Sequence, residues 1–568
     1  MVSEDYARSA IPLAEKTVAI FGAGIAGLSA AHEFVKRGWS VSVYEPNPDA
    51  GGFFRSARVA GNGNMPTEYS WHGMGPWYHN VFDLLKQIAF DDEGSVFERA
   101  LSRPIDFGVA PDEGEAVFDD STSWMVDVRK MFRMTQLDRL CGAYLMIKTW
   151  TANRRSIERY STLSAAEQWR KLLSPKAWST FVSCFGPWIG SDWTHVSLHQ
   201  AGLFFRRQLV TKPAHAHPAD AEGPAWIQDA RSGWLLLRGP SSEVWFDKWV
   251  RQLSESGVRF LFEETLHRFE FDGTRVTEAE LVSGTRVHAA LYVLATNPFA
   301  AADIVERTPA LARLDQLCLF RPLVKGGPHT QVSFCIGFNE TIRWPRKRCA
   351  VVLADSEFDL TIFAEEQVWA PGVELGAGVA SLWTGTACVS SVPGRLYGLP
   401  LERCTKEQFI EEVKTQLLQC GSLDALIRDA NNGRSLASFA FQKIEVWHEW
   451  TFSADGIRPR QPKWANTIYT QKFQPTQSTP VPNLLLAGAH TKTDADLWSI
   501  EAAVESGRRA AQVIEGDVVV LPQYRPTLLR FLGAVDDGLF AIHAPHVLDM
   551  ILGAAVVAVS ILLWVTLF

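Results

Sequence analysis

The chain has 568 residues, of which 47% are hydrophobic and 21% charged, and its formal net charge is −8. This length and composition predict two or more folded domains and exclude a largely disordered chain. The negative charge argues against a general nucleic-acid-binding protein, because such a protein needs a basic surface. The eight cysteines show no zinc-ribbon or CxxC spacing, which predicts buried thiols in a reducing compartment.

The first predicted unit is a strand, a glycine-rich turn and a helix. Residues 17–21 read as a short buried strand, residues 25–36 as a helix and residues 41–44 as the next strand. Together they predict a βαβ unit. The connecting turn has the spacing GxGxxG, and its residues are Gly22, Gly24, Ile25, Ala26 and Gly27.

This turn is typical of a dinucleotide-binding site. Gly22 permits a tight turn, Gly24 lets the backbone approach a pyrophosphate, and Gly27 lets the helix pack closely on the strand. The helix N-terminus offers free N–H groups and a partial positive charge to the phosphates. Glu45 ends the second strand, where its carboxylate can accept hydrogen bonds from an unphosphorylated adenosine ribose.

The next segment, EPNPDAGGFFRS, carries a paired glycine six and seven residues after Glu45. It resembles the second dinucleotide motif of flavin amine oxidases and carotenoid desaturases. The resemblance implies that the cofactor is FAD and that Gly51 and Gly52 pass close to its pyrophosphate. In that superfamily an arginine directly follows the paired glycine. Here Phe53 takes that place, and Arg55 is the candidate substitute.

The segment EYSWHGMGPWYHNVFDLL, residues 68–85, resembles the part of plant-type phytoene desaturases that carries a histidine and an aromatic-rich turn beside the flavin. The resemblance implies that His72 and Tyr78 help to shape the catalytic site, together with Arg207 from a later helical region. His215 and His217 share a surface loop without an apparent third ligand, so no metal site is predicted.

Strand and helix patterns return near residue 226 and resemble the family's return to the FAD domain. The resemblance implies that the backbone near Leu266 meets the adenine, and that Ala295 lies on the strand closing the nucleotide site. Residues 318–465 then predict a mixed sheet with aromatic strands.

Residues 483–511 read as a second strand, glycine turn and helix, and they resemble the superfamily's late flavin-binding unit. The implied roles are a backbone contact with the ribityl chain, and helix N-terminal amides that stabilise negative charge on the flavin pyrimidine. The family usually has an acid after the glycine, and this chain has alanine there. The residues concerned are Gly488, Ala489, Ile500, Glu501 and Ala502.

The end of the sequence is apolar. Residues 550–568 carry no charge, and nineteen helical residues extend roughly 28 Å, near the thickness of a bilayer core. They predict a transmembrane tail, a single-pass C-terminal anchor with the catalytic domains in the cytosol. The alternative is a buried C-terminal helix. Residues 528–543 could form an interfacial helix ahead of the tail.

The predicted fold class is α/β, an α+β two-domain flavoprotein. A discontinuous Rossmann-like FAD domain carries an inserted substrate domain with helical and mixed-sheet parts. The predicted boundaries are 15–100, 226–317 and 466–518 for the FAD domain, 101–225 (helical) and 318–465 for the substrate domain, 519–549 for the interfacial segment and 550–568 for the tail.

The predicted function is that of a membrane-attached FAD-dependent oxidoreductase similar to phytoene and ζ-carotene desaturases. The resemblance implies hydride transfer from a long isoprenoid or other lipid to the flavin, with reoxidation by quinone or oxygen. Three alternatives remain open: a flavin amine oxidase, a lipid dehydroxylase or isomerase, and a non-enzymatic prenyl-binding protein of the GDP-dissociation-inhibitor fold.

Overall fold

The computed structural model describes residues 16–567, apart from the following gaps: 69–71, 103–104, 120–127, 191, 211–233, 330, 346–347, 389–390 and 454–455. His215 and His217 therefore lie outside the described residues.

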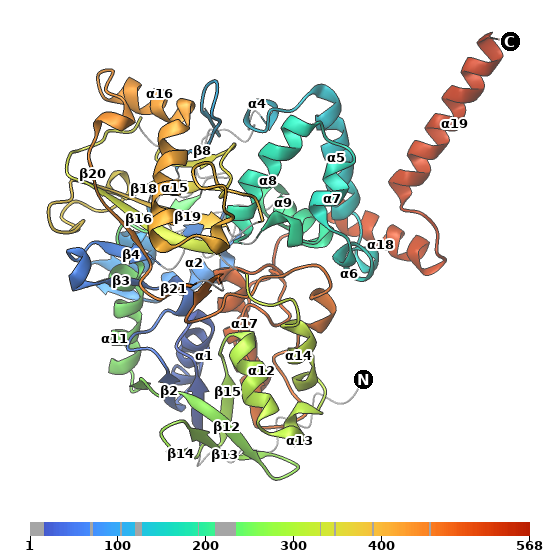
Figure 1. Ribbon diagram of the computed structural model, residues 1–568. Coiled ribbons are helices and arrows are strands. Elements are labelled where there is room, and N and C mark those ends of the chain that lie inside the picture. Colours follow the sequence, from blue (N-terminus) through green and yellow to red (C-terminus); the bar gives the residue numbers. More distant parts are fainter. Residues whose placement is uncertain are drawn as a thin grey trace.

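A five-stranded parallel sheet forms the lower half of the molecule in Figure 1. Its strands consist largely of buried Val, Ile and Leu, as expected for a parallel sheet that is covered on both faces. They come from three separate stretches of the chain, as the discontinuous FAD domain requires. The strand order is β11 (Arg259–Phe262), β2 (Ser40–Glu45), β1 (Thr17–Phe21), β15 (Leu291–Leu294) and β23 (Leu484–Leu486).

Two helices from opposite ends of the chain pack together beside this sheet, namely α1 (Ile25–Val35) and α17 (Ile500–Ile514) (Figure 1). Their closest approach is at Gly507, where an added Cβ would lie 2.3 Å from the carbonyl oxygen of Ala26. A glycine is needed there because any side chain would separate the helices. This packing brings the first and the last nucleotide-binding turns together.

A second, seven-stranded sheet lies in the upper half of Figure 1 and is mixed, because β8 and β17 are parallel while its other pairs are antiparallel. Two of its strands come from residues 101–225, which we expected to be helical. The short apolar run of β8 has no periodicity of its own and becomes a strand by pairing with β17, far along the chain. The strand order is β20 (Phe441–Val446), β16 (Gln331–Phe338), β19 (Ser381–Cys388), β18 (Thr361–Ala364), β17 (Ala350–Leu353), β8 (Phe107–Ala110) and β9 (Val117–Phe118).

The remaining elements surround these sheets. The helices are α2 (His79–Leu85), α3 (Val96–Ala100), α4 (Val128–Met131), α5 (Gln136–Trp150), α6 (Arg154–Glu158), α7 (Ala165–Arg170), α8 (Pro175–Ile189), α9 (Leu198–Val210), α11 (Asp247–Glu255), α12 (Pro298–Glu306), α13 (Pro309–Ala312), α14 (Phe320–Leu323), α15 (Lys406–Gln419) and α16 (Gly421–Ala430). The strands are β3 (Ser56–Arg58), β4 (Pro66–Glu68), β5 (Gly73–Met74), β6 (Ala89–Asp91), β7 (Gly94–Ser95), β10 (Leu235–Leu236), β12 (Leu266–Phe271), β13 (Val276–Leu281), β14 (Arg286–Val287), β21 (Trp450–Ser453) and β22 (Gly456–Pro459).

The last two helices, α18 (Thr527–Ala541) and α19 (Val547–Leu567), follow the second nucleotide-binding unit. Helix α18 lies beside α6, and α19 projects away from the body (Figure 1). Within the described residues, no helix is both long and apolar enough to cross a membrane. The transmembrane tail predicted for residues 550–568 is therefore not supported.

Candidate functional site

A cavity of about 530 Å³ opens where β1, β2, β15 and β23 end, a position typical of nucleotide sites in parallel sheets. Both predicted nucleotide-binding units reach it. Twelve of the predicted site residues line its wall, and these are Gly22, Gly24, Ile25, Ala26, Glu45, Gly51, Gly52, Tyr78, Ala295, Gly488, Ala489 and Ile500.

The three motif glycines occupy different steric environments. Gly22 has a φ of +111°, and its Cβ would lie 2.6 Å from the carbonyl oxygen of Ala295. Gly27 lies outside the cavity, where its Cβ would come within 1.9 Å of the Gly22 carbonyl oxygen. Gly24 has no such conflict and faces the cavity. The nearest atom to a Cβ added there would be the Cα of Gly52, at 4.0 Å. Gly22 and Gly27 are thus needed by the fold, whereas Gly24 leaves room for a ligand.

Glu45 is held at the cavity wall by backbone donors. Its Oε2 accepts a hydrogen bond of 2.7 Å from the N–H of Ala23, and its Oε1 accepts one of 3.1 Å from the N–H of Asn47. Burial raises the pKa of this carboxyl group, and the two N–H donors oppose that shift. The carboxylate thereby braces the glycine turn and lies where a ribose would meet it.

The late unit presents the beginning of α17 to the cavity through Ser499 and Ile500. Ser499 caps the helix, and its Oγ accepts a hydrogen bond of 3.2 Å from the N–H of Ala502. The predicted role of the Ala502 amide is therefore wrong, because that donor is already used. The Glu501 side chain also points away from the cavity, and its carboxylate accepts 3.0 Å bonds from the N–H groups of Asn80 and Val81.

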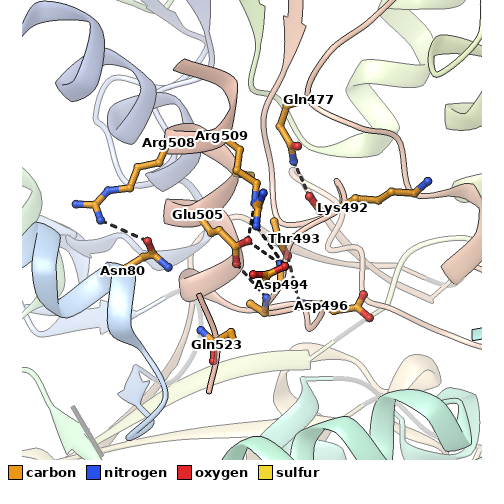
Figure 2. A network of polar contacts seen from close by, with 12 residues as sticks. Asn80, Gln477, Lys492, Thr493, Asp494, Asp496, Glu505, Arg508, Arg509 and Gln523 are labelled. Carbon is orange, nitrogen blue, oxygen red and sulfur yellow. Dashed lines mark hydrogen bonds and ion pairs between the residues drawn. The ribbon is translucent and has the colours of Figure 1, made fainter. Parts of the chain in front are cut away.

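A loop between Gly488 and α17 is fastened to that helix by a polar network (Figure 2). The buried carboxylate of Glu505 accepts hydrogen bonds from the N–H of Asp494 at 2.6 Å and from that of Ala495 at 3.0 Å. Arg509 also donates to it at 2.6 Å. Because the loop lies between two cavity-lining segments, this network fixes the shape of the cavity beside Gly488 and the beginning of α17.

Arg55 and Leu266 do not line the cavity in the described part of the chain. Arg55 is 2% exposed, and its guanidinium pairs with Glu449 at 2.7 Å and donates to the carbonyl oxygen of Gly52 at 3.3 Å, so it lies behind the paired glycine. Leu266 begins β12 and packs into the core beneath the separate three-stranded sheet. The predicted contact of the adenine with the backbone near Leu266 stays a prediction, since only the Leu266 side chain is placed in the core.

His72 and Arg207 approach the cavity without lining it. The His72 ring stacks on Phe54, with a centroid distance of 3.7 Å, and its Nδ1 lies 2.9 Å from Glu68 Oε2. Phe54 is the residue that reaches the cavity. Arg207 is buried, which lowers its pKa to about 10, and it donates to the carbonyl oxygen of Asp494 in the loop between Gly488 and α17. These two residues support the site from behind its wall.

Tyr78 is the predicted catalytic residue that does line the cavity, and its side chain is buried. Burial raises the pKa of its phenol well above the usual range, so the hydroxyl stays protonated at neutral pH.

Several polar residues of the wall were not predicted. Thr296 and His490 lie next to the predicted residues Ala295 and Ala489, whereas the others are brought to the wall by long-range packing and have no motif around them. Three of them bear polar atoms without a hydrogen-bond partner among the described residues: Thr296 Oγ1, His490 Nε2, and both Oδ1 and Nδ2 of Asn466. The other polar residues in this group are Gln200, Gln331 and Lys463.

Comparison with known families identifies this arrangement. A family profile described as flavin containing amine oxidoreductase matches residues 25–515. The chain belongs to this family. It is therefore an FAD-dependent oxidoreductase, and its cofactor is FAD.

Solved structures share the fold at low sequence identity. A putrescine oxidase bound to putrescine has a TM-score of 0.58 and 13% identity, with 87% of this chain and 98% of that chain covered. A cyclohexylamine oxidase from Brevibacterium oxydans has a TM-score of 0.53 and 16% identity, with 88% and 99% covered. An oxidoreductase from Methanosarcina mazei has a TM-score of 0.55 and 13% identity, with 86% and 98% covered.

A short stretch of the chain also resembles one curated protein that is not named as an amine oxidase. The carotenoid phi-ring synthase of Chlorobaculum tepidum is 26% identical over 110 residues, which are 19% of this chain and 16% of that protein. The chain thus matches less than a fifth of the length of that relative.

The cavity of this flavin oxidoreductase fits FAD. Gly24, Gly51 and Gly52 leave the backbone open beside the helix N-terminus, which suits a pyrophosphate. At the flavin end, the part of the cavity lined by Gly488, His490 and the beginning of α17, His490 is 2% exposed. Burial lowers its pKa to about 3, so its imidazole is neutral. Its Nε2 and the Thr296 hydroxyl have no partner among the described residues and can bond to the cofactor.

Proposed function

We propose that this enzyme oxidises a long apolar lipid, with an isoprenoid or carotenoid as the first candidate. The observation that carries the proposal is the aromatic wall of the cavity. Beyond the nucleotide-binding turns, the cavity is lined by Phe53, Phe54, Trp77, Tyr78, Phe204, Trp234, Leu497 and Trp498.

Such a wall favours an apolar substrate, because each buried CH₂ group contributes about 0.8 kcal/mol. Trp498 contacts both Phe53 and the buried Trp464, with centroid distances of 6.2 and 5.4 Å. Phe53 and Trp498 thus form an apolar part of the cavity wall, and Trp464 supports it from behind.

The second candidate is amine oxidation, which is favoured by the names of the structural neighbours. The charges at the cavity wall oppose it. Among the described lining residues, the carboxylates are Glu45 and Asp303, and both lie with the adenosine-side elements β2 and α12. The basic residues of the described wall are Arg460 and Lys463, and the buried Lys463 cation disfavours a protonated amine.

The short match to a carotenoid-modifying enzyme agrees with a lipid substrate. Bound FAD supplies the two-electron acceptor of the reaction. The chain's own residues provide an aromatic enclosure that excludes water and a neutral Tyr78 hydroxyl in the wall. We propose that quinone or oxygen then takes the electrons.

Anaerobic bleaching of the flavin tests the proposal, using a panel of C20–C40 isoprenoids and a panel of small amines. We expect isoprenoids to bleach the flavin and amines to leave it oxidised. Mass analysis then identifies the reaction. Loss of two hydrogens together with bleaching indicates desaturation. Loss of a hydroxyl oxygen as water, with reoxidation of flavin that was reduced beforehand, indicates dehydroxylation, and an unchanged mass with a new isomer and no net change of the flavin indicates isomerisation. Bleaching by amines alone, with an aldehyde formed, would contradict the lipid proposal.

We further propose that the enzyme attaches to a membrane through its C-terminal helices. On α18 the side chains of Leu528, Phe531 and Val535 share one helical face and are 65%, 64% and 37% exposed. Asp536, in contrast, is fully buried and pairs with Arg155 at 3.0 Å. The helix thus turns its polar side to the protein and its apolar side outward, as a helix at a lipid surface does.

A further inference from the structure

We propose that the cavity has a polar end, formed by Lys463, Gln331 and Asn466, that binds an oxygen acceptor on the substrate and holds a carboxylate most tightly. The inference rests on the proposed function, since it concerns the substrate of the same cavity. It restricts the substrate class to lipids that carry an oxygen function at one end.

Lys463 is the first observation. Its side chain is 6% exposed and lines the cavity. Within the described chain its Nζ donates one hydrogen bond, to Gln331 Oε1 at 2.8 Å, and no carboxylate lies within ion-pair distance. An ammonium group has three N–H donors, so two remain for a ligand. Burial lowers the pKa of Lys463 to about 8, and an anionic ligand would offset the cost of the buried charge.

The surroundings of Lys463 are built to hold its head in place. Gln331 Nε2 donates to Thr386 Oγ1 at 3.3 Å, which turns its Oε1 toward the ammonium. Gly190 has a φ of +71°, and an added Cβ there would lie 2.3 Å from Lys463 Nζ. The absence of a side chain at Gly190 therefore makes room for the ammonium group.

Asn466 is the second, independent observation. It is 2% exposed, lines the same cavity and lies three residues beyond Lys463. Neither Oδ1 nor Nδ2 has a hydrogen-bond partner among the described residues. A buried amide without partners costs free energy comparable to a lost hydrogen bond, and a wholly apolar hydrocarbon could not satisfy it.

The acceptor oxygen could come from the substrate or from the flavin. The elements involved favour the substrate. Gln331 begins β16 in the seven-stranded sheet, and Lys463 follows β22, whereas the nucleotide-binding turns belong to the other sheet. Trp464, next to Lys463, contacts Trp498 and His490, with centroid distances of 5.4 and 6.4 Å. The polar end thus adjoins the flavin end, where a substrate must lie.

The test compares a C20 isoprenoid carboxylic acid, its alcohol and its hydrocarbon on the FAD-loaded enzyme, with binding followed by perturbation of the flavin spectrum. We expect the acid to bind roughly ten- to a hundredfold more tightly than the hydrocarbon, as for a charge-assisted hydrogen bond. Lys463→Met should remove this preference and leave hydrocarbon binding unchanged. Lys443→Met, on the surface strand β20, is the matched control and should keep the preference.

A second variant guards against a folding defect in Lys463→Met. Asn466→Asp places a negative charge at the polar end and should weaken acid binding while sparing the hydrocarbon. If the acid and the hydrocarbon bind equally to the native enzyme, the inference is wrong. If Lys463→Met instead weakens FAD binding and keeps the acid preference, the ammonium serves the cofactor and the inference is also wrong.

Hexanoate and hexylamine separate this inference from the proposed function. If no C20 lipid binds but hexanoate does so in a Lys463-dependent way, the polar end stands and the lipid proposal fails. If hexylamine binds and hexanoate does not, the polar end is overturned. FAD affinity, measured by fluorescence in every variant, shows that the cofactor site is intact.

Discussion

Gly24 and Gly27 belong to one turn, but their missing side chains would meet different neighbours. We predict that Gly27→Ala lowers the free energy of unfolding by about 1–3 kcal/mol even without FAD, because its Cβ would meet the Gly22 carbonyl oxygen at 1.9 Å. Gly24→Ala should leave the apoprotein stable and weaken FAD binding roughly tenfold or more. Its φ of −70° suits alanine, but its methyl group would enter the cavity.

Denaturant unfolding of the apoproteins and FAD titration measure the two effects separately. Gly38→Ala is a control for backbone strain alone, since it has a φ of +75° and no neighbour within 4 Å. An equal loss of apoprotein stability in Gly24→Ala and Gly27→Ala would contradict the assignment.

The carboxyl group of Glu365 should make the free energy of unfolding depend on pH. Burial raises the pKa of Glu365 to about 8, and the nearby carboxylates Glu68 and Glu366 add to the shift, while Thr384 donates a hydrogen bond that opposes it. The folded-state pKa lies above the unfolded value, so the folded protein binds the extra proton. Its stabilising contribution is present below about pH 4.5 and is lost as the pH rises through about 8, by roughly 1.4 kcal/mol per unit of pKa difference.

Glu365→Gln should flatten the fall of unfolding free energy between pH 5 and pH 8, as measured by urea denaturation. The exposed Glu340→Gln, whose carboxylate pairs with Arg434, serves as the control and should keep the wild-type slope. A slope that is unchanged in Glu365→Gln would show that this carboxyl group titrates normally.

At the scale of single residues, the sequence predicts the roles that depend on neighbouring residues in the chain and misses those that depend on distant partners. Gly22, Gly24 and Gly488 lie in turns between a strand and a helix, so the GxGxxG spacing identified the first two and the resemblance of residues 483–511 identified Gly488. Arg55 is held by Glu449 and Lys463 by Gln331, and these partners lie 394 and 132 residues away. No pattern within a segment marks such pairs, because only the tertiary fold brings them together.

At the scale of elements, α17 and its preceding loop form one unit through Glu505 (Figure 2). We predict that Glu505→Ala lowers the free energy of unfolding by about 1–3 kcal/mol and speeds FAD release, because the N–H groups of Asp494 and Ala495 lose their buried acceptor. Arg509→Met removes the ion pairs to Glu505 and to the partly exposed Asp494 but leaves the Glu505 acceptor in place, and it should have a much smaller effect. Comparable losses in the two variants would show that the charge, and not the acceptor, holds the loop.

Among the elements, the strands and helices next to glycine turns were predicted well, since β1, α1, β23 and α17 all lie where the sequence placed them. The seven-stranded sheet was predicted only as a mixed region. Its order joins β8 to β17 and β16 to β20, and these pairings depend on contacts between distant segments. The domain boundaries inferred from the sequence stay predictions.

At the scale of the whole molecule, the proposed membrane attachment depends on α18 and α19. We predict that Leu528→Asp combined with Phe531→Asp lowers binding to neutral phospholipid vesicles at least roughly tenfold in a flotation assay. The reason is that two exposed apolar side chains would become charged. Val282→Asp, at a 65% exposed apolar position after β13, is the matched control and should float like the native protein.

Truncation after Asp549 tests α19 separately, because Asp549 itself pairs with Lys148 at 2.7 Å and holds the junction to α5. Loss of vesicle binding in this variant alone would assign the attachment to α19. Native protein that fails to float would refute membrane attachment through either helix.

The packing of α1 against α17 also has a consequence for biosynthesis. Ribosomes add roughly 5–20 residues per second, so this chain takes on the order of a minute to make. During most of that time β1 and α1 exist without Gly488 and Ser499, which line the cavity, and without Gly507, where α17 packs on α1. The nascent chain therefore cannot enclose FAD until its last part has emerged. Cofactor supply and the release of the finished chain must then coincide, and a shortage of flavin should appear first as protein lost shortly after synthesis.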